Sequence, residues 1–164
     1  MTSSTETPDP RAEQLARRIE AYRAATQEFL DVAGSLGPDD LDRRPAEPQG
    51  WTPRMVIHHM ADSETNSYVR LRRLLAEPAG AAIHGYDEEL WARELHYDRP
   101  VELSLAVVGA VRASSAEVLD RITPLDLART GVHSDSGSYA LADWLEIYTD
   151  HAADHAEQIR AALR

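Results

Sequence analysis

The sequence contains no cysteine. This absence excludes a disulfide, a cysteine nucleophile and a thiolate metal site, so any bound metal would need histidine or carboxylate ligands. The sequence also lacks an apolar run of 18 residues, which excludes a transmembrane helix. Its first ten residues are polar and acidic, without the basic start and apolar stretch of a signal peptide. We therefore expect a cytoplasmic protein.

Positive charge is scarce as well. The chain has 17 Lys and Arg against 28 Asp and Glu, a formal net charge of -11. A nucleic-acid binder needs a basic patch for the phosphates, and an anionic lipid surface would repel this chain. Its basic clusters lie on expected helices or among acids, as is typical of solvated helix faces: 17–18, 43–44 and 70–73. We expect neither a nucleic-acid nor a membrane partner.

The apolar content suits one globular domain. Hydrophobic residues make up 43% of the 164 residues, enough to bury a core without disulfides. Residues 1–9 are polar, and we expect them to form a disordered tail. Residues 10–164 are expected to form the single folded domain.

Four stretches repeat apolar residues at the spacing of an amphipathic helix. They cover about 10–34, 53–75, 101–122 and 139–162, and Thr52 before Pro53 is a typical helix start. This pattern predicts an all-α protein, a four-helix bundle, with a short extra helix in the central connection.

The connections between these helices are rich in turn residues. The stretch 38–50 is expected to hold at most a short helical turn, and 86–95 a short helix. We expect 123–138 to be a loop in which Ser138 caps the last helix. A mixed α/β fold is the alternative, because 78–100 could contain a strand.

His151 and His155 lie four residues apart in the last helix. This spacing puts both imidazoles on one face, where they can bind the same ion. Chance produces such a pair in roughly one of four sequences with this histidine content, so spacing alone is weak evidence. However, His155 is in phase with the apolar residues, and His151 is in line with Trp144 and Tyr148. Buried imidazoles need polar partners, and a metal ion supplies one.

The second helix offers a third candidate ligand in the adjacent pair His58 and His59. His59 shares a face with the apolar and small residues of this helix, whereas His58 falls outside that face. Periodicity therefore favours His59 as the inward ring and predicts that His58 is exposed or lies behind a ligand. The remaining histidines fall in expected loops and are predicted to be surface residues: His84, His96 and His133.

Three histidines from two helices would leave coordination positions open, as in catalytic metal sites. Such a site can activate water or a thiol. Imidazole ligands suit zinc, nickel, copper or iron, so the donor set does not select the metal. The residues near the histidines in sequence that could accept the second N–H of a ring are Asp62, Asp150 and Asp154. In a less favoured alternative, Glu64 or Asp62 completes a site of two histidines and one carboxylate.

Three segments in this order resemble the DinB superfamily: GWTPRMVIHHMADSETNSYVRLRRLL, GYDEELWA and DSGSYALADWLEIYTDHAADHAEQI. The likeness is greatest to its YfiT-like metal-dependent hydrolases, near the bacillithiol S-transferases. It runs from about Gly50 to Ile159, and 13–36 fits the first helix of the family.

The resemblance implies a four-helix bundle in an up-down-down-up arrangement. It implies a metal held by one histidine of the second helix and two of an H-x3-H motif, which by position are His59, His151 and His155. It also implies zinc or nickel, a homodimer and, for some relatives, a low-molecular-weight thiol such as bacillithiol, mycothiol or glutathione. The chain departs from close relatives where they carry further histidines: at Glu64, Asp154 and Gln158.

We therefore expect a metal-dependent enzyme that acts on a small molecule, either a hydrolase or a thiol S-transferase. Its catalytic residues beyond the metal ligands are not identified by the sequence. One alternative is a non-catalytic helical module that binds a metal or ligand in a stress response. Another is a helical dimerisation domain whose histidines only pack.

Overall fold

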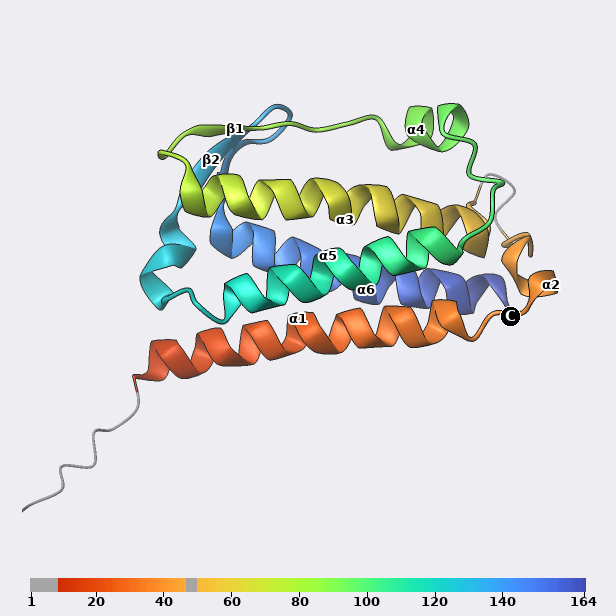
Figure 1. The fold of residues 1–164 in the computed structure, drawn as a ribbon, viewed down its shortest axis with the longest axis horizontal. Helices are drawn as coiled ribbons and strands as arrows, with labels where there is room; N and C mark the ends of the chain where they lie inside the picture. The colour runs from red at the N-terminus through yellow and green to blue at the C-terminus, as the bar shows by residue number, and fades with distance from the viewer. Residues whose placement is uncertain (1–8, 47–49) are drawn as a thin grey trace, which may run out of the picture.

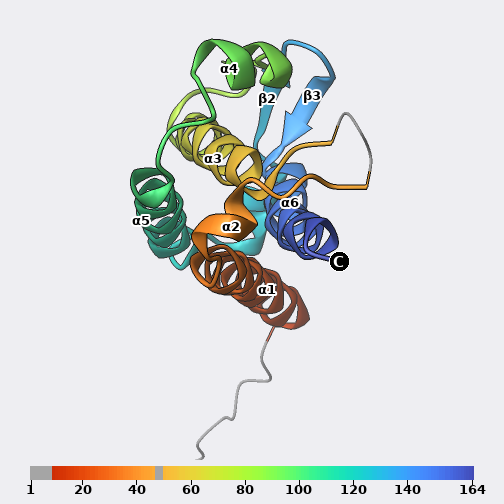
Figure 2. The same cartoon turned by 90° about the vertical axis from the view of Figure 1, so that its right-hand side faces the viewer.

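The computed structural model describes residues 9–46 and 50–164. Apart from Asp9, the expected tail of residues 1–9 lies outside the described residues. Four long helices run side by side along the molecule (Figure 1): α1 (Pro10–Gly34), α3 (Pro53–Ala76), α5 (Glu102–Leu119) and α6 (Leu141–Ala162). Viewed end-on, α1 and α3 occupy opposite corners, and each packs against both α5 and α6 (Figure 2).

The helix directions follow the up-down-down-up order. In Figure 1, α1 and α6 run one way, and α3 and α5 run the other. Two consecutive long helices can run parallel only if the chain returns along the bundle between them, and residues 77–101 make this return. The predicted all-α four-helix bundle is confirmed, and no helix in the described parts of the chain is long and apolar enough to span a membrane.

Side-chain caps place the starts of the first two long helices. The Asp9 carboxylate accepts a hydrogen bond from the Arg11 backbone N–H, and the Thr52 hydroxyl accepts one from that of Met55. A proline follows each cap, where its missing N–H costs nothing and its fixed φ suits the first turn. The predicted start of the second helix at Thr52 is therefore confirmed.

The connections carry short elements. The first contains α2 (Pro38–Leu41), a single turn, and the long return contains β1 (Ala81–Ile83) and α4 (Glu88–Glu94). The connection into α6 contains the 3-10 helix η1 (Pro124–Ala128), then β2 (Thr130–His133) and β3 (Gly137–Ala140). The expected short extra helix of the central connection is α4.

A small three-stranded sheet was anticipated only in part. The sequence left open a strand within 78–100, where β1 lies, but the prediction of a loop over 123–138 is wrong, because η1, β2 and the start of β3 lie there. β1 pairs parallel with β2, and β2 pairs antiparallel with β3. The prediction that Ser138 caps the last helix is wrong, because Ser138 lies inside β3 and Ala140 occupies the cap position. Gly131 permits the parallel pairing, since a Cβ there would lie 2.7 Å from the carbonyl oxygen of Ala81.

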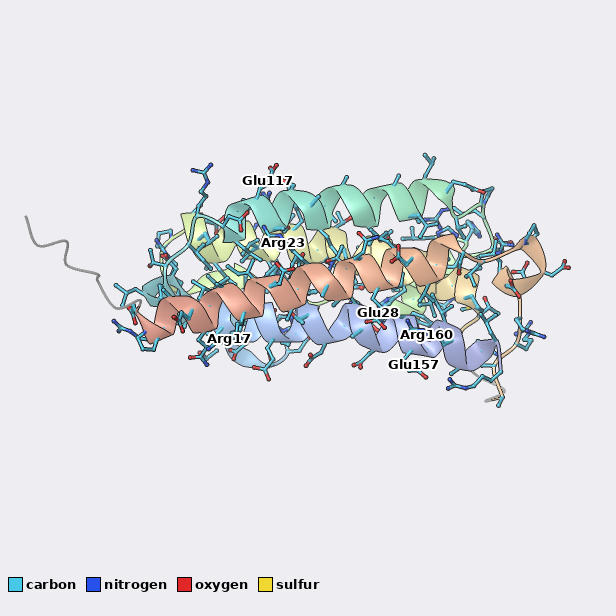
Figure 3. All side chains as sticks on the ribbon, turned by 90° about the horizontal axis from the view of Figure 1, so that it is seen from below. Arg17, Arg23, Glu28, Glu117, Glu157 and Arg160 are labelled. Atoms are coloured by element: carbon cyan, nitrogen blue, oxygen red, sulfur yellow. The ribbon has the colours of Figure 1, made fainter. Side chains whose placement is uncertain are left out.

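Two clusters of apolar side chains fill the bundle. One surrounds Trp144 and Tyr22, and the other surrounds Phe29 and Met60. On the outside, Arg160 of α6 lies 2.6 Å from Glu28 of α1, and Figure 3 shows this pair at the seam between the two helices. The histidines of interest lie on α3 and α6, which pack against each other on a different face of α6 from the one that contacts α1 (Figure 2).

Candidate metal centre

Three histidines meet between α3 and α6. The Nε2 atom of His151 lies 3.2 Å from Nε2 of His59 and 3.0 Å from Nε2 of His155. Ligand atoms of all three residues lie within 4.8 Å of one another, the one such group among the described residues. The structure therefore brings together the three histidines singled out in the sequence.

Helix geometry explains this convergence. His151 and His155 are one turn apart on α6, with their ring centroids separated by 4.4 Å. His59 projects from the facing side of α3 and is 1% exposed. Trp51 packs against its ring at a centroid distance of 4.8 Å. Since the rings are held on two packed helices, the cluster is part of the rigid bundle.

The spacing of the three nitrogen atoms fits a single metal ion. In a tetrahedral zinc site with Zn–N bonds of about 2.0–2.1 Å, ligand nitrogens lie roughly 3.3 Å apart. The two separations from Nε2 of His151, 3.0 and 3.2 Å, are close to this value. Three neutral imidazoles that turn the same ring atom toward one another cannot all be satisfied by their mutual hydrogen bonds, whereas a cation accepts all three lone pairs. The donor set therefore suits a divalent ion.

The interior keeps two of these rings in the neutral form that binds metals. Burial, together with the neighbouring His155 and His151, lowers the pKa of His59 to about 3. Burial likewise lowers the pKa of His155 to about 4, with a contribution from His151. Protons therefore compete poorly for these two rings near neutral pH.

These depressed pKa values predict a pH-dependent stability of the metal-free protein. His59 and His155 gain protons near pH 6.5 when unfolded but only near pH 3 and 4 when folded. Between about pH 4 and 6.5 the unfolded chain therefore binds more protons, and acid favours unfolding. We expect the free energy of unfolding to fall as the pH is lowered through this window, by up to about 1.4 kcal/mol per pH unit for each ring.

Urea titrations of the chelator-treated protein between pH 7 and pH 5 measure this dependence. The matched variant is His59→Gln, which removes one of the two rings and should show a shallower slope. A slope unchanged in the variant would contradict the assignment of the effect to His59.

The far nitrogens of the ligand rings have different surroundings. Nδ1 of His155 lies 2.7 Å from the Gln158 side-chain oxygen, so it can donate a hydrogen bond there. Nδ1 of His151 is buried without a hydrogen-bond partner and lies 3.7 Å from Oε1 of Glu64. Nδ1 of His59 is also buried without a partner.

None of the three acids considered as partners of the ligand rings contacts a ring, in agreement with the alternative that acids near the histidines in sequence are ordinary surface residues. Asp62 accepts a hydrogen bond from the hydroxyl of Tyr97 at 2.6 Å, and Asp150 and Asp154 are exposed on α6. No described hydrogen bond joins any of the three to a histidine ring. Asp150 and Asp154 each directly precede a proposed ligand in the sequence. Adjacent helix positions point about 100° apart, so their side chains point away from the histidine rings.

The prediction for His58 also needs correction. His58 is fully buried, not exposed. Its Nε2 lies 2.9 Å from the backbone oxygen of Arg99, and its Nδ1 lies 2.8 Å from the hydroxyl of Ser104. Nε2–H therefore donates to the carbonyl and Nδ1 accepts from the hydroxyl. These two hydrogen bonds link α3 to the start of α5 and to the chain just before it. The choice of His59 for the inward cluster agrees with this arrangement.

A buried ion pair lies beside the cluster. Arg112 of α5 donates to Glu64 of α3 at 2.6 Å, and their side chains are 0% and 1% exposed. The sequence reasoning did not select Arg112, although it follows the inward-facing Val108 by one helical turn. Glu64 lies on the Nδ1 side of His151, away from the three Nε2 atoms, so the geometry does not favour the alternative in which it replaces a histidine ligand.

A pocket of about 230 Å³ adjoins His151. Its remaining lining residues come from α3, α6, the segment from β1 to the start of α4, and the end of β2 with the turn after it: Ser63, Arg70, Gly85, Tyr86, Glu88, His133, Asp135, Ile147 and Tyr148. His133, expected to be a surface loop residue, instead ends β2 and lines this pocket. His84 and His96 are exposed, as expected.

Comparisons with known proteins agree on one family. The family model of the DinB superfamily matches residues 21–159. A protein of Oceanobacillus iheyensis is 38% identical over 115 residues, covering 70% of this chain and 66% of the relative's length. A protein of Bacillus mycoides is 33% identical over 139 residues, covering 81% of this chain and 80% of that protein. Both carry the name "Putative metal-dependent hydrolase".

A solved structure matches nearly the whole chain. YfiT from Bacillus subtilis is described as a probable metal-dependent hydrolase with an unusual four-helix bundle topology. It superposes with a TM-score of 0.82 at 26% identity, covering 98% of this chain and 91% of YfiT. The helix order, the extent of the family match and the likeness to these relatives lead to one conclusion: the chain belongs to the DinB superfamily.

Proposed function

We propose that His59, His151 and His155 bind one divalent metal ion through Nε2, and that the chain is a metal-dependent enzyme acting on a small molecule. The observation that carries this proposal is the convergence of three histidines from two packed helices, with Nε2 of His151 lying 3.2 Å from Nε2 of His59 and 3.0 Å from Nε2 of His155. Three protein ligands leave at least one coordination position for water or substrate, as in catalytic metal sites.

A divalent ion held by these three histidines would lower the pKa of a bound water or thiol and would polarise a substrate carbonyl. The surrounding residues prepare the site for such chemistry. Burial keeps His59 and His155 neutral, and Gln158 fixes the ring of His155. The pocket beside His151 is the candidate position for the substrate, because it is lined by one of the three proposed ligands.

The pocket walls indicate the kind of substrate. Tyr86, Ile147 and Tyr148 give it an apolar surface, and Ser63 and Arg70 add hydrogen-bond donors. Its volume of about 230 Å³ is below the usual range of ligand pockets, about 300–1,000 Å³. We therefore propose that it accepts a small substrate, or one arm of a larger one.

The reaction is hydrolysis if the nucleophile is water and S-transfer if it is a low-molecular-weight thiol such as mycothiol or bacillithiol. The names of the relatives support the hydrolase, and the family resemblance supports the thiol. On that resemblance we also propose zinc or nickel as the ion, and a cytoplasmic homodimer. Imidazole nitrogen is a suitable donor for both metals.

The test uses chelator-treated protein reloaded with zinc or nickel. We would assay it against a panel of 4-nitrophenyl esters, and against 1-chloro-2,4-dinitrobenzene with mycothiol, bacillithiol or glutathione. We expect turnover that requires the metal and is lost in His155→Ala but kept in His84→Ala, an exposed histidine away from the cluster. Stoichiometric metal without turnover on either panel would contradict the enzyme and favour a non-catalytic metal-binding module.

A further inference from the structure

Glu64 lies behind the ring of His151, in the interior of the bundle. Its Oε1 atom is 3.7 Å from Nδ1 of His151, while Nε2 of the same ring faces His59 and His155. The carboxylate is therefore outside the group of three Nε2 atoms and next to the opposite nitrogen of one of them. This position suits an acceptor for a ring proton.

His151 needs such an acceptor. An imidazole that gives its Nε2 lone pair to a metal carries its proton on Nδ1. Nδ1 of His151 is buried and has no hydrogen-bond partner, which is costly for a buried donor. A shift of less than 1 Å would bring it within hydrogen-bond distance of Glu64, since such N–H···O bonds span about 2.7–3.2 Å.

Arg112 holds the Glu64 carboxylate in place. Its Nη1 atom lies 2.6 Å from Glu64 and 3.0 Å from the backbone oxygen of Tyr148, one turn before His151 on α6. Its Nε donates to the hydroxyl of Thr26 at 2.6 Å, and its Nη2 donates to the backbone oxygen of Tyr22. One guanidinium therefore fixes Glu64 relative to α1 and to the turn that carries His151.

We propose that Glu64 is a positioning residue for the metal centre, held by Arg112 and accepting a hydrogen bond from Nδ1–H of His151. This inference rests on the proposed function, because it requires His151 to bind the ion through Nε2. A carboxylate in this position fixes the tautomer and orientation of the ring and makes its other nitrogen a stronger donor. It also places a negative charge near the bound cation.

The three ligands would then differ in strength. His151 is supported by a carboxylate, His155 by the neutral amide of Gln158, and His59 by no described partner. A charged acceptor increases ring basicity more than a neutral one. His151 is accordingly the strongest donor of the three, and loss of the Glu64 charge weakens the whole site through it.

The test measures metal affinity rather than activity. Glu64→Gln removes the charge at nearly constant size, and competition with a chromogenic chelator gives the Kd for zinc. We expect the Kd to rise about 10–100-fold. The matched control is Asp62→Asn, two residues away on α3, whose carboxylate contacts Tyr97 instead of a ligand ring. Its Kd should equal that of the wild type.

A double variant separates positioning from folding. Glu64→Gln alone leaves Arg112 buried without a counter-charge, which destabilises the protein for a reason unrelated to the metal. Glu64→Gln combined with Arg112→Met removes both charges. We expect the double variant to regain a higher Tm than Glu64→Gln while its Kd stays weakened. Recovery of both properties would show that Glu64 acts only on folding and would overturn the proposal.

The tautomer of His151 gives a readout that needs no metal. Long-range ¹H–¹⁵N spectra of the chelator-treated protein at about pH 8 report which nitrogen of a neutral ring carries the proton. We expect Nδ1–H in the wild type and a shift toward Nε2–H in Glu64→Gln. If the wild type binds no metal, the proposed function fails and the role of Glu64 with it. If the wild type and Glu64→Gln bind zinc equally tightly, the proposed role of Glu64 is overturned while the proposed function stands.

Discussion

Replacing His151 by alanine is expected to abolish stoichiometric metal binding. His151 occupies the centre of the cluster, since its Nε2 lies within 3.2 Å of Nε2 of both other rings. Loss of a direct ligand should weaken affinity by more than the roughly 10–100-fold associated with loss of a partner behind a ligand. Elemental analysis after dialysis should give about one ion per wild-type chain and a near-zero content for the variant.

Two control substitutions test whether the loss of metal is specific to the proposed ligands. His84→Ala removes an exposed ring, and His58→Ala removes the buried ring that bonds Arg99 and Ser104. Both should retain the metal, although His58→Ala should lower stability. Metal lost in His58→Ala but retained in His59→Ala would contradict the assignment of the ligand on α3.

Replacing Arg112 by alanine is expected to lower the free energy of unfolding by about 3–5 kcal/mol, the usual cost of breaking a buried ion pair. Arg112 is the buried partner of Glu64, which would be left as an uncompensated charge 1% exposed to solvent. The substitution also removes the hydrogen bonds to Thr26, Tyr22 and Tyr148 that join three helices. Urea denaturation followed by circular dichroism measures this loss.

The control for Arg112→Ala is Arg160→Ala, which removes an arginine–glutamate ion pair of the same N–O distance at the surface. Arg160 lies 2.6 Å from Glu28, but both side chains are more than 40% exposed, at the α1–α6 seam shown in Figure 3. Exposed pairs contribute about 0–1 kcal/mol, so Arg160→Ala should have a small effect. An Arg112→Ala variant no less stable than Arg160→Ala would show that the buried pair does not hold the bundle together.

The bundle was predictable because its signals are local. The apolar phase of each helix and the Thr52-Pro53 start lie within a few neighbouring residues, and they predicted the long helices. The sheet was not predictable in the same way. Its strands have three or four residues, too short for a clear alternation, and β1 pairs with β2 from about 50 positions away in the chain.

The site shows the same division. His151 and His155 were predictable from their spacing and phase on one helix, and His59 from its phase on another. The residues behind the ligand rings were mostly not predicted from spacing and phase. Glu64 was considered only as a metal ligand, and Arg112, which pairs with Glu64, lies on a third helix. The acids nearest in sequence to the histidines point elsewhere, as Asp62 does toward Tyr97. Gln158 was within reach, because it lies three residues after His155 on the same helical face.

The central claim is that three histidines hold one divalent ion through Nε2. Anomalous diffraction at the absorption edge of the bound metal, from crystals of the reloaded protein, tests this claim most directly. We predict one peak about 2.0–2.1 Å from Nε2 of each of His59, His151 and His155, with at least one further position occupied by solvent. No peak at the cluster, or a peak bonded to the Glu64 carboxylate in place of one histidine, would contradict it.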